Sequence, residues 1–144
     1  MAKKISNFLV VLACLTSFLI TPSYTCWAPF RWSILITNGI QNSTISVHVQ
    51  SKDDDLGFHN ITYNNGYSMF FCERLIQSTL FWGHFSYGEK SAFFNVFDIK
   101  VSDFVKGLPF KLNHAYWLFK NDGYYLSKSF KAFDDPAWVK QGKW

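Results

Sequence analysis

Short β-prone segments, each ended by turn-forming residues, recur about every ten residues between positions 32 and 127. The clearest is residues 44–50 (TISVHVQ), where Ile45, Val47 and Val49 alternate with polar residues. This period of two indicates a strand with one buried face and one face toward water. Many short strands at regular spacing are typical of a β-sandwich.

Other segments share this character. We expect further strands at residues 32–38, 58–63, 67–73, 79–86, 91–98, 115–120 and 124–127. A longer helical period is absent, and residues 101–107 have room for one helical turn. The sequence therefore predicts an all-β fold, a small antiparallel β-sandwich of about eight short strands. Its core would span residues 32–128, with a loosely ordered tail at residues 129–144.

The N-terminus has the order of a secretory signal. Lys3 and Lys4 precede an apolar run at residues 8–20, and Pro22 and small residues follow. We expect a signal peptide at residues 1–25, cleaved after Thr25. The alternative is a retained anchor, but the run has about 13 residues and spanning a bilayer takes about 20. Residues 26–144 would then be one secreted, extracellular domain without membrane insertion.

Charge and composition argue against several classes of protein. The whole chain has a net charge of +4, and without Lys3 and Lys4 of the predicted signal peptide the charge is about +2. This charge is small and evenly spread, which does not fit a nucleic-acid-binding surface. The four histidines lack metal-ligand spacing, although His48 and His84 lie on strands that could be neighbours. Nothing resembles a nucleophile elbow or a paired-carboxylate site, so we expect no enzyme and no cofactor. The 16 Phe, 7 Tyr and 6 Trp can fill a core even in a domain this small.

Two glycosylation sequons and two cysteines remain after the predicted cleavage. The sequons begin at Asn42 and Asn60, and a secreted chain would meet the machinery that modifies them. Cys26 and Cys72 would meet an oxidising compartment, which favours one bridge between them. The alternatives are a buried free Cys72 and a disordered or intermolecular Cys26.

The three consecutive acidic residues Asp53, Asp54 and Asp55 could form a calcium-binding site. Calcium needs six to eight oxygens from a shaped loop, whereas three adjacent side chains point in different directions. A solvated turn is the better account. Asp55 would brace the turn before Gly57, where we expect a positive φ.

Four stretches together resemble one known family. Residues 47–57 (VHVQSKDDDLG) are similar to the signature of the plant self-incompatibility S1 family, whose members are also called S-protein homologues. Residues 79–85 (TLFWGHF), 94–98 (FNVFD) and 117–125 (WLFKNDGYY) resemble later motifs of that family in the same order. The first strand, with Ile36 and Asn38, also fits. The resemblance covers about residues 32–128.

The resemblance implies a secreted, non-catalytic β-sandwich. It further implies a signalling ligand for a cell-surface receptor, with a role in pollen–pistil self-incompatibility as the best-understood case. Family members commonly carry four cysteines, at positions that correspond here to Val49, Gly83, Leu112 and Ala115. We expect packing to replace those bridges, with Val49, Leu112 and Ala115 in the core. A divergent copy that folds poorly is the alternative.

Recognition by such a sandwich would use its loops. We expect the contacts to come from residues 51–57, 64–67, 87–90 and 121–123. The candidate residues in them are Asp53, Asp54, Asp55, Asn64, Asn65, Glu89, Lys90, Asn121 and Asp122. The alternative function is a secreted carbohydrate-binding module that uses exposed tryptophans. Trp138 and Trp144 are the candidates for exposure, because they lie outside the strand pattern. The oligomeric state is left open.

Overall fold

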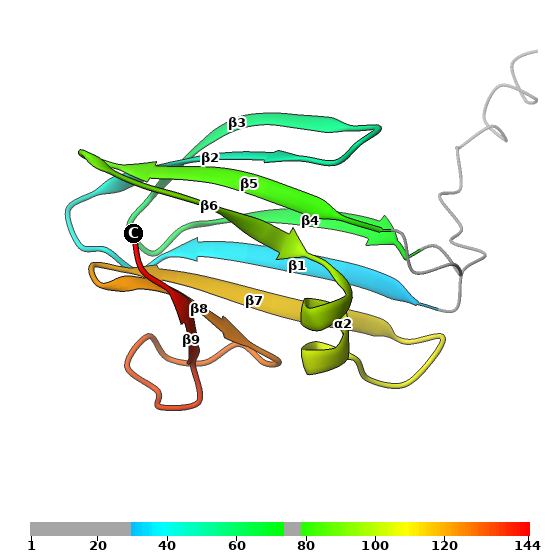
Figure 1. Ribbon diagram of the computed structural model, residues 1–144. Helices are drawn as coiled ribbons and strands as arrows, with labels where there is room; N and C mark the ends of the chain where they lie inside the picture. Colours follow the sequence, from blue (N-terminus) through cyan, green and yellow to red (C-terminus); the bar gives the residue numbers. More distant parts are fainter. Residues whose placement is uncertain (1–29, 74–78) are drawn as a thin grey trace, which may run out of the picture.

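The computed structural model describes residues 30–73 and 79–144 as a two-layer β-sandwich (Figure 1). The predicted signal peptide and Cys26 lie outside the described residues. The strands are β1 (Arg31–Asn38), β2 (Thr44–Gln50), β3 (Asp55–Thr62), β4 (Gly66–Cys72), β5 (Phe81–Tyr87), β6 (Lys90–Phe97), β7 (Leu112–Lys120), β8 (Gly123–Ser127) and β9 (Val139–Gly142). One short helix, α2 (Ile99–Val105), follows β6. The all-β prediction is confirmed.

The two layers are a five-stranded sheet, in the order β4-β1-β7-β8-β9, and a four-stranded sheet, in the order β3-β2-β5-β6. All neighbouring strands are antiparallel except β1 and β7, which run parallel with Ile34 opposite Ala115. This parallel pair differs from the expected antiparallel arrangement. It joins the first strand of the domain to one much later in the chain, which local patterns cannot indicate.

Strand alternation produces the core in the way the sequence predicts. Ile45, Val47 and Val49 of β2 are all fully buried, whereas the residues between them face outward. Aromatic rings fill much of the space between the sheets, as in the stacked pair of Phe94 and Tyr124, whose centroids lie 3.9 Å apart. Trp117 adds a polar link by donating its indole N–H to the carbonyl of Val96 at 3.1 Å.

The β1–β2 connection is organised by Asn38, the buried last residue of β1. Its amide nitrogen donates to the carbonyls of Ile61 at 2.9 Å and Ser43 at 3.1 Å. Its side-chain oxygen accepts from the backbone N–H of Ile40 at 2.8 Å. One side chain therefore ties β1, the following turn and β3 together, and all of its hydrogen-bonding groups have partners.

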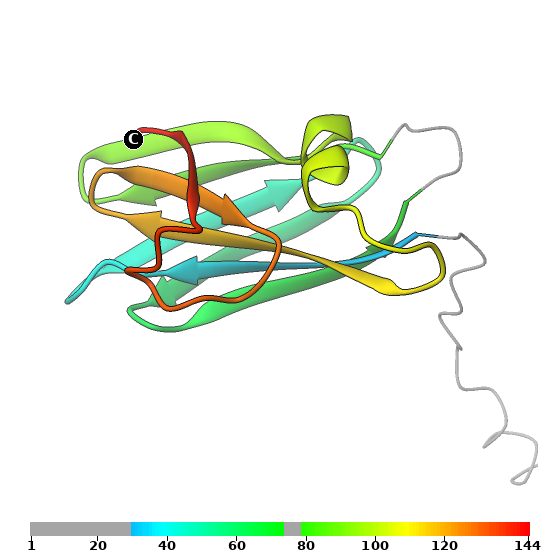
Figure 2. The same ribbon diagram turned by 90° about the horizontal axis from the view of Figure 1, so that it is seen from below.

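Helix α2 lies two residues earlier than the turn expected at residues 101–107. Asp98 caps it, because the Asp98 carboxylate accepts from the backbone N–H of Val101 at 3.0 Å. Glu73, which is buried at the end of β4, accepts from Trp32 Nε1 at 3.0 Å and from Ser102 Oγ at 3.3 Å. These contacts anchor the helix to one end of the sandwich (Figure 2).

The expectation of a loosely ordered tail at residues 129–144 is wrong. β9 pairs with β8, and Trp138 is buried with its indole N–H donated to Ala132 O at 2.8 Å. Trp144 packs on Phe119 and Tyr87, at centroid distances of 5.2 and 5.9 Å. The tail therefore forms an edge strand and covers part of the core.

The positions that correspond to the family's cysteines are filled by packing in three cases. Val49 and Gly83 face each other across β2 and β5, and Val49, Gly83 and Ala115 are buried. Leu112 is 42% exposed, so its predicted core role is wrong. In β7 the alternate residues Asn113, Ala115 and Trp117 are buried, so Leu112 points to the outer face of the sheet.

Candidate functional site

Two of the stretches that carry the family resemblance meet at one end of the sandwich. Residues 51–54, which connect β2 to β3, lie across a cavity of about 430 Å³ from residues 79–82, where β5 begins. Phe71 and Cys72 at the end of β4 complete the described lining. The first stretch belongs to one of the predicted recognition loops. The cavity itself was not predicted, because it forms only when separate strands assemble.

Ser51 shapes the connecting loop. Its hydroxyl accepts from the backbone N–H groups of Asp53 at 3.2 Å and Asp54 at 2.9 Å. Its own N–H donates to Asp54 O at 2.7 Å. This is a local serine turn, which sets how the loop residues face the cavity.

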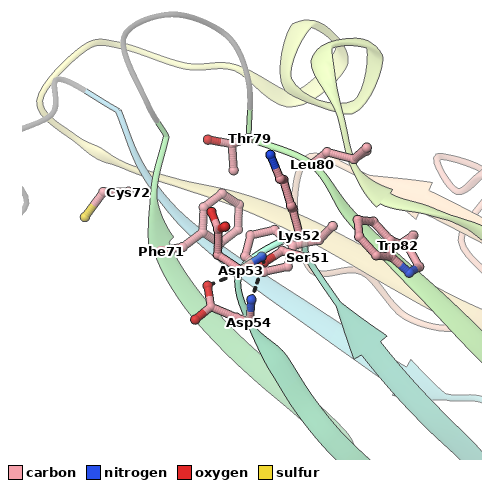
Figure 3. Close-up of a pocket in the computed structure, with 10 residues that line it drawn as sticks. Ser51, Lys52, Asp53, Asp54, Phe71, Cys72, Thr79, Leu80 and Trp82 are labelled. Carbon is pink, nitrogen blue, oxygen red and sulfur yellow. Dashed lines mark hydrogen bonds between the residues drawn. The ribbon is translucent and has the colours of Figure 1, made fainter.

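The cavity combines an aromatic floor with a charged rim. The Phe71 ring packs on Phe81 and Phe97, with centroids 4.8 and 4.7 Å away, so the floor is held by the core. Figure 3 shows Lys52 directed toward the Thr79 and Leu80 side and Asp53 directed toward Phe71. Such an arrangement suits an apolar group flanked by polar or charged groups.

Asp55 braces the loop from its far end. Its carboxylate lies 2.7 Å from His48 Nε2, and it accepts from the N–H of Gly57 at 2.9 Å and from Gln50 Nε2 at 3.1 Å. The Gly57 N–H and the His48 contact are the main reasons that the pKa of Asp55 lies below its ordinary value. Gly57 has a φ of +77°, as expected. β3 starts at Asp55, so the predicted turn is shorter than residues 51–57.

The other three predicted loops lie at the opposite end of the sandwich (Figures 1 and 2). There the β5–β6 turn contacts the β7–β8 turn, because Lys90 Nζ donates to Asn121 O at 2.9 Å. A smaller hollow of about 200 Å³ lies beside them. Its lining residues are Lys90, Asn121, Asp122, Lys143 and Trp144. The nine candidate recognition residues are all exposed, but they divide between two ends.

Asp122 holds the C-terminal segment, residues 129–144, against the domain. Its carboxylate accepts from Lys140 Nζ on β9 and from the Tyr125 hydroxyl at 2.6 Å. These two hydrogen bonds lower the pKa of Asp122 to about 2, and the Asp122 contact raises the pKa of Lys140. The geometry therefore assigns Asp122 a structural role.

The remaining predicted sites have the following places. Asn42 and Asn60 are exposed, at the β1–β2 turn and on β3. Cys72 is disulfide-bonded, and its pairing with Cys26 remains a prediction because Cys26 is not among the described residues. His48 and His84 are opposite each other on β2 and β5, as expected.

The tryptophan interpretation of a carbohydrate-binding face is wrong for Trp138, which is buried. Trp144 is half-buried against the core and also lines the smaller hollow. Across residues 30–73 and 79–144, no group of three or more His, Cys, Asp or Glu side chains is placed to hold a metal ion. No helix in the same residues is long and apolar enough to cross a membrane.

Comparisons with known proteins agree with the motifs. The family model described as plant self-incompatibility protein S1 matches residues 33–144. S-protein homolog 1 of Arabidopsis thaliana is 32% identical over 115 residues, which is 79% of this chain and 72% of that protein. S-protein homolog 74 of the same plant is 32% identical over 100 residues, or 69% and 64% of the two chains. S-protein homolog 5 is 28% identical over 128 residues, or 86% and 95%. No solved structure matches the chain.

Proposed function

The chain belongs to the plant self-incompatibility protein S1 family, and we propose that it is a secreted ligand that binds a protein on a cell surface. The predicted signal peptide at residues 1–25 and the two sequons support passage through the secretory pathway. The observation that supports the binding proposal is a single cavity lined by two of the stretches that resemble the family. The two resembling stretches, residues 51–54 and 79–82, lie in different parts of the chain and line the same surface hollow.

The cavity suits a protruding part of a partner protein. An apolar side chain of the partner would enter between Phe71, Leu80 and Trp82. Lys52 on the rim would contact a carboxylate or carbonyl group of the partner at the edge of the interface. A buried apolar centre surrounded by polar contacts is the common anatomy of protein interfaces.

Secretion is tested by expressing the full chain with a C-terminal tag in plant cells. We expect the protein in the extracellular fluid with an N-terminus at Cys26. A version that lacks residues 1–25 should stay inside the cell. Equal retention of both versions would contradict the proposal.

The partner is tested by crosslinking from two lysines. A photoreactive group is placed at position 52 on the cavity rim or at position 143 beside the opposite hollow. On intact cells we expect a specific adduct from position 52 that excess unlabelled protein prevents. An adduct obtained only from position 143 would move the interface to the other end.

A role in pollen–pistil recognition is the narrower form of this proposal. It requires expression in the stigma or pistil and a change in pollen-tube growth when purified protein is added. Expression confined to roots or leaves would assign the ligand to another signalling process.

A further inference from the structure

The outer face of the four-stranded sheet carries a row of rings that crosses all four strands. Phe58 of β3 is opposite His48 of β2, His48 is opposite His84 of β5, and His84 is opposite Phe93 of β6. The Phe58 and His48 rings stack with centroids 3.9 Å apart, and those of His84 and Phe93 are 4.4 Å apart. Phe58 and Phe93 are 76% and 59% exposed. We call these four residues the ring row.

The sequon at Asn60 opens onto the same face. Asn60 lies two residues after Phe58 on β3, and residues i and i+2 of a strand point to the same side at a separation of about 7 Å. Asn60 is exposed and is opposite Ser46, the outward neighbour of His48 on β2. A glycan on Asn60 would therefore start next to the Phe58 ring.

We propose that the glycan attached to Asn60 packs its first N-acetylglucosamine against Phe58 and so covers the β3 end of the ring row. This inference rests on the proposed function, because only a secreted chain meets the glycosylation machinery. One side of a pyranose ring presents C–H groups, which are apolar and suit the π face of an aromatic ring. Burying part of a ring that is 76% exposed adds a favourable hydrophobic contribution.

The attached glycan is favoured over a free sugar as the occupant. Its covalent link keeps the first sugar near the ring at a high effective concentration, so a weak contact forms readily. β3 is also an edge strand of its sheet, with backbone groups open to pairing by another chain. A glycan at this edge would block such pairing and shield the exposed Phe58.

The chain contains its own control. The other sequon begins at Asn42, where the residue two positions earlier is Ile40, which is buried and not aromatic. A glycan at Asn42 leaves from a turn with a φ of +54° and has no equivalent ring beside it. Phe93 provides a second control, because it is an exposed phenylalanine stacked on a histidine at the far end of the ring row.

The full chain is expressed in plant cells and collected after secretion. The cells are treated so that the attached glycans can still be cut by glycosidases. Asn42→Gln leaves only the Asn60 glycan, and Asn60→Gln leaves only the Asn42 glycan. Each is combined with Phe58→Ser or Phe93→Ser. Glycan occupancy comes from mass spectrometry, and the midpoint of thermal unfolding is measured before and after trimming to one sugar and after complete removal.

We expect the Asn60 glycan to raise the unfolding midpoint by about 2–5 °C, with most of the gain retained by the single sugar. Phe58→Ser should remove that gain, whereas Phe93→Ser should leave it, and neither change should alter the effect of the Asn42 glycan. The N-acetyl methyl resonance of the first sugar on Asn60 should also shift upfield by ring current, and this shift should vanish in Phe58→Ser.

An equal gain with and without Phe58 would overturn the inference, as would an empty Asn60 beside a glycosylated Asn42. Both of these results leave secretion intact. Specific binding of free oligosaccharides to the ring row of Asn60→Gln would assign the surface to an external sugar instead. Retention of an unglycosylated chain inside the cell would contradict the proposed function itself.

Discussion

The Phe85 ring lies over Gly83, so closely that a Cβ atom on Gly83 would be 2.6 Å from the ring atoms Cε2 and Cζ. Phe85 is buried and held from its other sides by Phe94 and Phe119, with both centroids 4.7 Å away. The ring therefore fills space beside Gly83, at a position where the family resemblance implies a cysteine. This relationship explains how packing takes the place of a sulfur atom in β5.

Gly83→Ala should destabilise the domain because Phe85 has no room to move aside. We expect a loss of about 1–3 kcal/mol in the free energy of unfolding, measured by urea denaturation. Combining it with Phe85→Leu should cost less than the sum of the two single changes, since the smaller side chain makes room. Strictly additive losses in the free energy of unfolding would contradict the contact between Gly83 and Phe85.

Cooperative unfolding of the unchanged domain would argue against the alternative of a poorly folding copy.

Asn38 should be among the most sensitive polar positions. Asn38→Ala leaves the Ile40 N–H and the Ile61 carbonyl without their buried partner, so we expect a loss of at least about 2 kcal/mol in unfolding free energy. The matched control is Gln41→Ala, an exposed change in the adjoining turn that should stay within about 0.5 kcal/mol. Equal effects of the two changes would mean that the Asn38 hydrogen bonds contribute little.

Acid should release the tail before it unfolds the rest of the domain. The pKa of Asp122 is lowered to about 2 by Lys140 and Tyr125, whereas an unfolded aspartate titrates near about 3.9. The Asp122 contribution to stability is thus fully present above about pH 4 and is lost as the pH falls toward 2. Hydrogen exchange of the β9 amides should accelerate in that range. In Asp122→Asn the exchange should already be faster at pH 7, and this acid step should be absent.

We expect Cys72 to be joined to Cys26 in protein that is expressed through the secretory pathway. Peptide mapping without reducing agent should recover one cross-linked peptide that contains both residues. Cys72→Ser should lower the free energy of unfolding by about 2–5 kcal/mol under oxidising conditions. A reducing agent should then have a negligible effect on the stability of this variant. Two free thiols in the secreted protein would contradict the pairing.

Local patterns predicted most of the strands. β2 spans the predicted residues, since Ile45, Val47 and Val49 alternate without interruption. β9 was missed because Val139, Lys140 and Gln141 are all exposed and show no alternation. That strand depends on pairing with β8 and on the packing of Trp144, which are tertiary contacts.

The candidate site was predicted only in part for a similar reason. Residues 51–54 could be singled out because their motif is local. The cavity also needs Phe71, Leu80 and Trp82, whose approach depends on how the two sheets pack. The hydrogen bond between Lys140 and Asp122 could not be predicted either, because β9 was not predicted.

Competition on intact cells tests most directly whether the cavity at the β2–β3 end binds a cell-surface partner, as we propose. Labelled protein is displaced by unlabelled wild type, by Lys52→Glu on the cavity rim, or by Lys143→Glu at the opposite end, two variants with the same change in charge. We predict that Lys143→Glu competes like the wild type, whereas Lys52→Glu needs at least about tenfold more protein, or about 1.4 kcal/mol. Equal competition by both variants would contradict the account.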